Sequence, residues 1–300
     1  MKIIDIDIVV PILVKEIKPN SIIIPKPTLI SRGSSSIEVE QTFQCDVDYY
    51  GGVGIEQDGA VDAKLVKNHN TMTATFTGLS QDTEYTIKGV GLPILGNETI
   101  GEGLVVRTKA SPIPNEYQLV EYLESDGRQY INTLLSDLTI GMYIEGRIII
   151  SLQDDTGFCG NVNPSNVIWW DRNQYLFMWR GTSYYTGVRD ISVNKKFELN
   201  YLQSGEAKID DVVFASFTNT TNNLNRILLF GAWYGRPYGI PIAQIVNAKF
   251  SIGVNKVRDM YPVYRKSDNK PGMYDIVNGT FYTNQGTGKF LVGPDKEWEE

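Results

Sequence analysis

The sequence predicts an all-β protein built from two successive sandwiches. Short β-prone runs recur along the whole chain, separated by Gly, Pro, Asn and Asp, and no helix of useful length is evident. Near the middle, Ser111–Asn115 (SPIPN) holds two prolines in three residues, which cannot continue a strand ladder and favour an extended spacer. Many short strands on either side of one spacer indicate two β domains.

Composition and charge exclude several classes of function. Hydrophobic residues make up 42% and charged residues 21% of the 300 residues, which is enough to bury a core. The net charge is −7, with no basic block. Since phosphate neutralisation supplies most non-specific affinity, we expect no binding to nucleic acid, and for the same reason none to anionic membranes. No apolar run approaches the roughly 18–20 residues of a spanning helix.

Residues 1–20 have two interpretations. The first is the initial strand of the next sandwich, and the second is an arm that adds to the sheet edge of a partner protein. Pro11 and Pro19 confine either strand to an edge position. The segment lacks a basic region followed by an uninterrupted apolar region and a cleavage site, so we expect no signal peptide. Its partner-docking residues would be those that alternate with Asp5 and Asp7: Ile4, Ile6, Ile8 and Val10.

Residues 21–110 carry short strands at sandwich spacing. We expect strands at Ser21–Ile24, Ser36–Gln44, Ala60–Leu65, Thr71–Thr77, Glu84–Val90 and Gly103–Thr108. The run TATFTGLSQDTEYTIKGVG resembles the corner between the fifth and sixth strands of fibronectin type III domains, with Leu79 and Tyr85 at the corner positions, and VVRTKA resembles the last strand. The resemblance implies that the Tyr85 hydroxyl fixes the corner. Because residues 1–110 contain no Trp, the domain is expected only to be Ig-like or fibronectin-like.

Residues 116–296 form the second expected domain, followed by an acidic, frayed tail at 297–300. Two hairpins stand out, one around Ser204-Gly205 and one at Asn278-Gly279, where a type I′ turn would pair Met273–Val277 with Thr280–Thr283. The other expected strands are Gln129–Asn132, Met142–Ser151, Val167–Trp170, Tyr175–Trp179, Phe197–Gln203, Ala207–Ile209, Val212–Phe217, Arg226–Phe230 and Ala243–Gly253. This order is typical of a two-sheet jelly roll.

Two motifs of this domain resemble a known family. EYQLVEYLESDGRQYIN (116–132) is similar to the opening segment, and VRDMYPVYRKSDNKPGMYDIVNGTFYTNQGTGKFLVG (257–293) to the closing segment, of concanavalin-like, laminin-G-like domains found in virion and surface proteins of gut phages and gut bacteria. Both motifs are packing and turn signatures.

The resemblance implies a non-enzymatic component of a tailed, crAss-like phage virion, either a capsid decoration or a head-fibre protein. Its N-terminal part would anchor and its jelly roll would face outward. Its partners would be capsid or fibre subunits and copies of itself, with assembly in the host cytoplasm.

The sequence lacks the common catalytic motifs. There is no G-x-S-x-G motif, no P-loop and, in the second domain, no Glu-x-Asp-x-x-Glu run of the kind that sandwich glycosidases use. The glycine clusters Gly51–Gly54 and Gly157–Gly160 do not open a helix, so no phosphate cradle is expected.

The sequence also contains few residues at the spacings that metal ligands require. His69 stands alone in a polar turn, and Cys45 and Cys159 are expected to be free thiols, with an interdomain disulfide as the alternative. The acidic pairs Asp46/Asp48, Asp154-Asp155 and Asp210-Asp211 are expected in solvated turns. Asp154 and Asp155 have a second interpretation as a Ca²⁺ site at a loop rim, and no other cofactor is expected.

Aromatic residues form two groups that could bind glycan, because flat rings stack on sugar faces. In one group Trp169 and Trp170 precede the candidates Trp179, Tyr184 and Tyr185. The other is the Gly-rich loop Phe230–Gly239, with candidates Trp233, Tyr234, Arg236 and Tyr238. The competing interpretation is that these rings fill the core. A glycan-binding adhesin is therefore the alternative function, and a polysaccharide-cleaving enzyme is a third.

Overall fold

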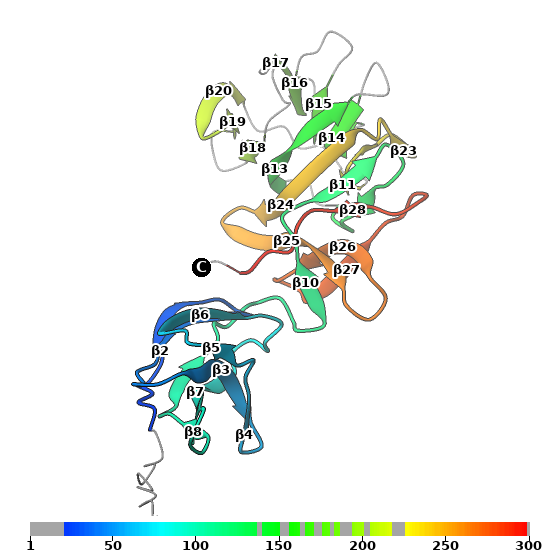
Figure 1. Cartoon of the computed structure of the whole chain (residues 1–300). Coiled ribbons are helices and arrows are strands. Elements are labelled where there is room, and N and C mark those ends of the chain that lie inside the picture. The colour runs from blue at the N-terminus through cyan, green and yellow to red at the C-terminus, as the bar shows by residue number, and fades with distance from the viewer. Residues whose placement is uncertain are drawn as a thin grey trace, which may run out of the picture. The chain divides into compact units, whose positions relative to one another are not determined.

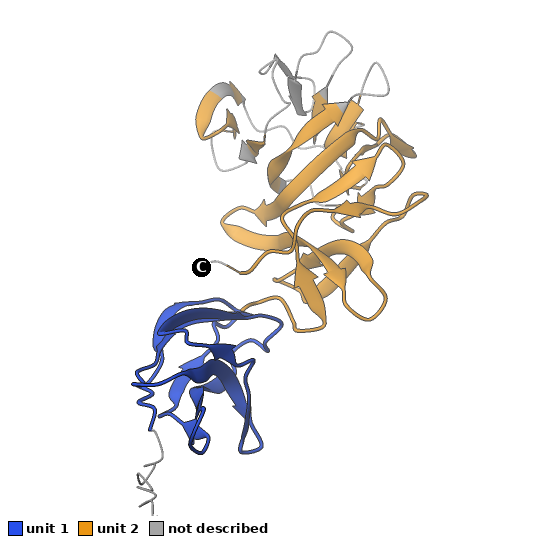
Figure 2. Ribbon diagram, viewed as in Figure 1, with its two compact units in different colours: residues 1–110 blue, residues 111–300 orange. Residues whose placement is uncertain are grey.

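A computed structural model describes residues 21–136, 140–150, 156–162, 166–170, 176–180, 183–186, 194–200, 205–217 and 226–298. The chain divides into two compact units, residues 1–110 and 111–300 (Figures 1 and 2). Every regular element in the described ranges is a strand, and none of those ranges contains a helix that could cross a membrane. The structure thus confirms the predicted all-β class.

Unit 1 is a sandwich of two antiparallel sheets. One sheet has the order β1-β2-β6, and the other has the order β4-β3-β7-β8, with β5 beside β3 and β9 beside β7. Ile37 and Val39 of β2 pack with Val53 of β3 and Ile87 of β7 between the sheets. The strands are β1 (Thr28–Arg32), β2 (Ile37–Thr42), β3 (Tyr49–Gln57), β4 (Ala60–Asp62), β5 (Val66–Lys67), β6 (Thr71–Phe76), β7 (Glu84–Pro93), β8 (Thr99–Ile100) and β9 (Leu104–Arg107).

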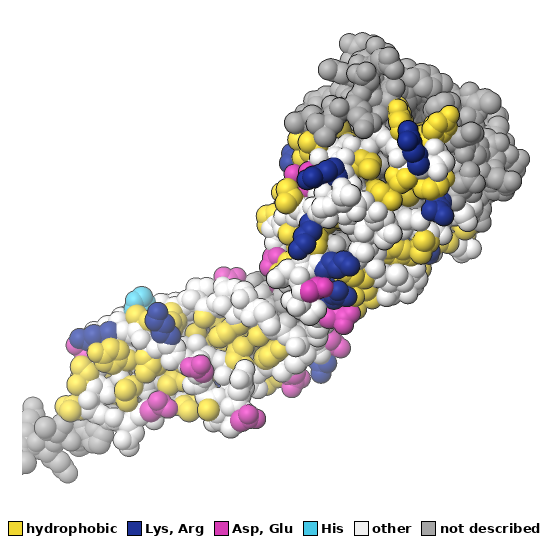
Figure 3. Space-filling model, turned by 90° about the vertical axis from the view of Figure 1, so that its right-hand side faces the viewer, with side chains coloured by type: hydrophobic (Ala, Val, Ile, Leu, Met, Phe, Trp, Pro, Cys, Tyr) yellow, Lys and Arg dark blue, Asp and Glu magenta, His cyan; other side chains and the backbone are white. Residues whose placement is uncertain are grey.

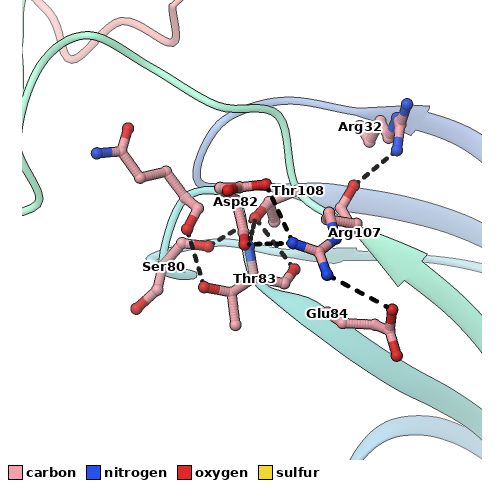
Figure 4. Close-up of polar contacts among 8 residues, drawn as sticks. Arg32, Ser80, Asp82, Thr83, Glu84, Arg107 and Thr108 are labelled. Carbon is pink, nitrogen blue, oxygen red and sulfur yellow. Dashed lines mark hydrogen bonds and ion pairs between the residues drawn. The ribbon is translucent and has the colours of Figure 1, made fainter.

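A polar network fixes the corner between β6 and β7. The backbone N–H of Ser80 donates to the Tyr85 hydroxyl at 2.8 Å, so the predicted role of Tyr85 is confirmed. The Thr108 hydroxyl donates to the Ser80 carbonyl at 2.6 Å and accepts the Thr83 N–H at 3.0 Å. Arg107, one residue earlier, donates to the Asp82 carbonyl at 3.1 Å (Figure 4). The end of β9 is therefore tied to the corner.

The glycine cluster Gly51–Gly54 lies inside β3, a strand that the sequence analysis missed. A Cβ on Gly54 would lie 2.2 Å from the Asp62 carbonyl oxygen, and one on Gly52 would lie 2.7 Å from the Lys64 carbonyl oxygen. Glycine in a strand interior often marks such a close backbone approach. These residues serve packing.

Unit 2 is a larger sandwich of an 11-stranded and an 8-stranded sheet. The large sheet contains β10 (Tyr117–Leu119), β11 (Leu123–Asp126), β13 (Ile140–Ile150), β18 (Lys195–Asn200), β19 (Gly205–Ile209), β20 (Val212–Phe217), β24 (Ile242–Ile252), β25 (Asn255–Arg265), β26 (Lys270–Asp275), β27 (Thr280–Thr283) and β28 (Leu291–Val292). The small sheet contains β12 (Ile131–Asn132), β14 (Thr156–Asn161), β15 (Asn166–Trp170), β16 (Leu176–Arg180), β17 (Ser183–Thr186), β21 (Leu228–Leu229), β22 (Ala232–Trp233) and β23 (Pro237–Tyr238).

The main core of unit 2 lies between these sheets. Phe197 of the large sheet meets Phe158 of the small sheet edge-on, with ring centroids 5.7 Å apart. Met142, Ile144 and Phe250 belong to the same buried cluster. The second glycine cluster, Gly157–Gly160, is part of β14, where a Cβ on Gly157 would lie 2.5 Å from that of Ala232.

The two family-like motifs of unit 2 pack against each other. The Tyr130 N–H donates to Asn284 Oδ1 at 3.2 Å, and the Gln285 N–H donates to the Tyr130 carbonyl at 2.9 Å. A Cβ on Gly286 would lie 2.1 Å from the Arg128 carbonyl oxygen, so this contact needs glycine. The first and the last segment of the domain sequence are therefore in direct contact.

The hairpin at Asn278-Gly279 differs from the prediction. Asp275 pairs with Thr280, which leaves a four-residue loop in which only Gly279 has a positive φ. The Asp275 carboxylate is buried and accepts the N–H groups of Asp259 and Val277, and the Asp275 carbonyl accepts the Gly279 N–H at 2.9 Å. These bonds end the strand earlier than the predicted type I′ turn would.

A second, smaller core covers the outer face of the large sheet at β25 and β26. Ile113 is buried there with Leu119, Val263 and Tyr274. Trp298 meets the Tyr261 ring edge-on at 4.9 Å. The segment predicted as a linker and the segment predicted as a frayed tail therefore both contribute a side chain to the packing of unit 2.

Candidate functional site

The predicted aromatic loop Phe230–Gly239 forms a small hairpin at the edge of the small sheet. β22 pairs with β23, placing Trp233 opposite Pro237, and β22 also bridges β14 in parallel at Asn161. The turn closes through the Tyr234 N–H, which donates to the Arg236 carbonyl at 2.8 Å, and Gly235 has φ +67°. Proline lacks a backbone N–H and usually blocks strand pairing, yet Pro237 pairs with Trp233 here, in a hairpin only two residues deep on each side.

Three aromatic rings from two parts of the chain form one cluster. Trp169 of β15 stacks on Tyr238 of β23, with centroids 5.7 Å apart and planes 10° apart. Tyr234 meets Tyr238 edge-on at 6.4 Å. Tyr234 is 55% exposed and Tyr238 is 36% exposed, whereas Trp169 and Trp233 are half-buried. The cluster is thus fixed at its base and open to solvent at its tip.

Cationic side chains flank these rings. The Arg226 guanidinium lies over the Trp233 ring, 4.6 Å from its centroid, and Arg236 is exposed at the turn. Arg226 was not among the predicted site residues. Its partner lies seven positions along the chain and on another element, so no local pattern signals the contact.

The other aromatic candidates are described through their backbones. β16 and β17 pair with Trp179 opposite Tyr184 and Met178 opposite Tyr185. The side chains of Trp179, Tyr184 and Tyr185 fall outside the part that the structure describes, as do Asp154 and Asp155 and the whole of the predicted arm, with Ile4, Ile6, Ile8 and Val10.

The described ranges include several of the candidate metal-ligating and thiol residues. They contain no group of three or more His, Cys, Asp or Glu side chains placed to hold a metal ion. His69 is exposed, as predicted, and is the cyan residue of Figure 3. Cys45 and Cys159 are free, Cys159 is buried, and burial raises the pKa of its thiol. Asp210 and Asp211 form the two-residue turn between β19 and β20, as expected.

A second surface feature lies on the outer face of the large sheet. A hollow of about 580 Å³ is lined by Tyr143, Glu198, Lys249 and Lys256, among other residues. The Lys249 ammonium lies 5.5 Å from the centroid of the Tyr143 ring. Burial, followed by the nearby carboxylates of Glu145 and Asp211, raises the pKa of Tyr143 to about 12. The sequence analysis named none of these lining residues.

Comparison with known proteins gives likenesses among solved structures. No family model matches the chain, and no curated protein matches it. Among solved structures, the chain is similar to a protein from Bacteroides ovatus ATCC 8483 described as a candidate carbohydrate-binding protein. The two share 8% sequence identity with a TM-score of 0.46 over 89% of this chain and 95% of the other.

Proposed function

We propose that this chain is a non-enzymatic binding protein whose unit 2 binds glycan through the aromatic cluster of Trp169, Tyr234 and Tyr238, together with Trp233 of the same hairpin. The single observation that carries the proposal is the Trp169–Tyr238 stack, whose centroids lie 5.7 Å apart, with Tyr238 36% exposed. A ring that only filled the core would be covered. Here parallel rings from β15 and β23 hold one another in place and leave ring surface in water.

Energetics support a binding role for the open rings. Burial of apolar surface contributes about 25 cal/mol per Å² of favourable free energy. A sugar face or a protein surface that covered the exposed rings of Tyr234 and Tyr238 would therefore gain this free energy on binding. Arg226 and Arg236 supply donors beside the rings for hydroxyl or carboxylate oxygens. Trp, Tyr and Arg are also the residue types that dominate binding hot spots.

A glycan array probed with the full chain and with Tyr238→Ala and Trp233→Ala variants tests this function. We expect discrete glycan signals that each substitution weakens by about tenfold or more, as for a hot-spot residue. Tyr50→Ala is the matched control, because Tyr50 is a similarly exposed tyrosine of unit 1, at 41%. The proposal fails if the native chain binds no glycan, or if both cluster variants bind as the native chain does. Release of reducing sugar from a bound glycan would instead indicate an enzyme.

We further propose that the setting is a tailed-phage virion, in which unit 2 is displayed outward and other virion subunits are the partners. The support is the resemblance of residues 116–132 and 257–293 to a family found there, and the direct packing of Tyr130 on Asn284 and Gln285 gives the two motifs a shared structural role. Mass spectrometry of purified virions tests the setting. Absence of the chain from such virions would contradict the virion proposal and would not affect the glycan proposal.

A further inference from the structure

A row of directly opposed residues crosses the outer face of the large sheet of unit 2. Tyr143 of β13 lies opposite Glu198 of β18 on one side and opposite Lys249 of β24 on the other. Its chain neighbours Met142 and Ile144 are buried in the core. Because successive side chains of a strand point to opposite faces, Tyr143 and the two charged residues face outward.

The row continues by one residue at each end, and both outer residues are neutralised within the chain. Lys208 of β19 lies opposite Glu198 and pairs with Glu206 at 3.2 Å. Asp259 of β25 lies opposite Lys249 and pairs with Lys256 at 2.6 Å.

The inner residues differ from the outer ones. Within the part of the chain that the structure describes, no ion pair within 4.0 Å involves Glu198 or Lys249. Both side chains are half-buried beside the hollow over Tyr143. Glu198 and Lys249, neither of which forms an ion pair within 4.0 Å in the described residues, therefore lie on either side of one tyrosine, each one strand spacing away, about 4.8 Å.

The row of Glu198, Tyr143 and Lys249 is complementary to itself under a two-fold rotation, although an axis along β13 also sets Glu145, which faces outward like Tyr143, over its own copy. A two-fold axis parallel to β13, passing above Tyr143, would place Glu198 of one copy over Lys249 of a second copy, and the reverse pair would form at the same time. Two-fold interfaces need such reciprocal contacts, in which residue i meets j and j meets i. A rotation about any axis that set Glu198 over Glu198 would be repelled.

From this symmetry we infer that the outer face of the large sheet binds a second copy of this chain, with the two-fold axis passing above Tyr143 and two reciprocal Glu198–Lys249 ion pairs. The inference does not depend on the glycan proposal, because the aromatic cluster is on the other sheet. Four strands at about 4.8 Å, with about six residues each at about 3.3 Å, cover roughly 400 Å² per copy, or about 800 Å² in total, because the second core already covers much of β25. That area is typical of a weak, reversible dimer.

Charge reversal with the full chain tests this dimer. Sedimentation velocity over a dilution series should show reversible dimers of the native chain. Glu198→Lys alone would place Lys over Lys, and Lys249→Glu alone would place Glu over Glu, so each should weaken the dimer by about tenfold or more. An equal mixture of the two variants should dimerise, because in the mixed pair both contacts join Lys to Glu. The double variant Glu198→Lys/Lys249→Glu should also regain the dimer.

Two charge-reversal variants at other exposed positions serve as controls. Glu98→Lys and Lys289→Glu reverse exposed charges elsewhere and should leave the dimer unchanged, and circular dichroism should show every variant folded. A native chain that stays monomeric would overturn the inference, as would single variants that dimerise normally. Failure of both the mixture and the double variant to recover would do the same.

Discussion

The backbone N–H of Ser80 donates a 2.8 Å hydrogen bond to the hydroxyl of Tyr85, five residues later in the chain. The Tyr85 ring packs on the unit 1 core together with Leu79, so one side chain joins the corner backbone to the interior. The resemblance of this stretch to a fibronectin type III corner had predicted the contact, although unit 1 lacks a tryptophan.

Tyr85→Phe should destabilise unit 1 by about 1 kcal/mol, because it deletes one hydrogen bond and keeps the ring. Urea unfolding of the full chain measures the change. Tyr50→Phe is the control, since Tyr50 is an exposed tyrosine of the same unit. An equal effect of the two substitutions would show that the corner bond contributes nothing.

Gly146→Ala should destabilise unit 2 by about 2 kcal/mol or more, since the new Cβ would lie 2.1 Å from the Gln244 carbonyl oxygen in the neighbouring strand. Gly231→Ala is the matched control. Its nearest neighbour would be Ile240 at 3.5 Å, an ordinary contact, so we expect a change within about 0.5 kcal/mol. Thermal unfolding of both variants distinguishes the two sites, and equal melting temperatures would contradict this account.

Ile113→Ala should cost unit 2 about 2–5 kcal/mol, as for other large-to-small changes at buried sites. Ile113 is only 5% exposed and packs with Leu119, Val263 and Tyr274. Ile94→Ala provides the comparison, because Ile94 is 56% exposed and should tolerate the change. If Ile113→Ala left the unfolding of unit 2 unaltered, residues 111–115 would be the free spacer that their prolines suggest.

Alkaline pH should weaken unit 2 through Tyr143. Burial and nearby carboxylates raise its pKa from 10.0 to about 12, so folding favours the neutral phenol. The resulting stability is fully present below pH 10 and is lost as the pH rises toward 12. Urea unfolding at pH 9 and pH 11 should therefore show a smaller loss for Tyr143→Phe than for the native chain. Part of the loss should remain, because burial also raises the pKa of Tyr261. Identical losses would contradict the assignment to Tyr143.

Local patterns predicted the fold class and one corner well, but they misplaced turns. Asn278-Gly279 carries a strong hairpin signal, yet the buried Asp275 carboxylate fixes a longer loop. The two-residue turns with φ positive at both positions lie instead at Asp58-Gly59 and Asp210-Asp211. Asp-Gly at 58–59 was a readable signal of this kind.

Contacts between distant segments explain the remaining gaps. Strands β3 and β14 were missed because their glycines lower β propensity, and the backbones that make glycine necessary come from elsewhere in the sequence. Prediction of the candidate site was limited in the same way. The loop Phe230–Gly239 could be singled out by composition, whereas the stacking of Trp169 on Tyr238 joins residues 69 positions apart. The Glu198–Tyr143–Lys249 row depends on strand register, which no single segment encodes.

The packing of Ile113 and Trp298 into one small core means that unit 2 starts and finishes at the same place. Val120 bridges Asp295, and the Lys296 N–H donates to the Leu119 carbonyl at 2.9 Å, so the entering and leaving strands are neighbours. A domain with adjoining ends can be spliced into a surface loop of an unrelated host protein without stretching either junction. For the same reason unit 2 should tolerate circular permutation, in which the present ends are joined and new ends are made at another loop. Unit 2 could therefore be transferred between chains as a single piece.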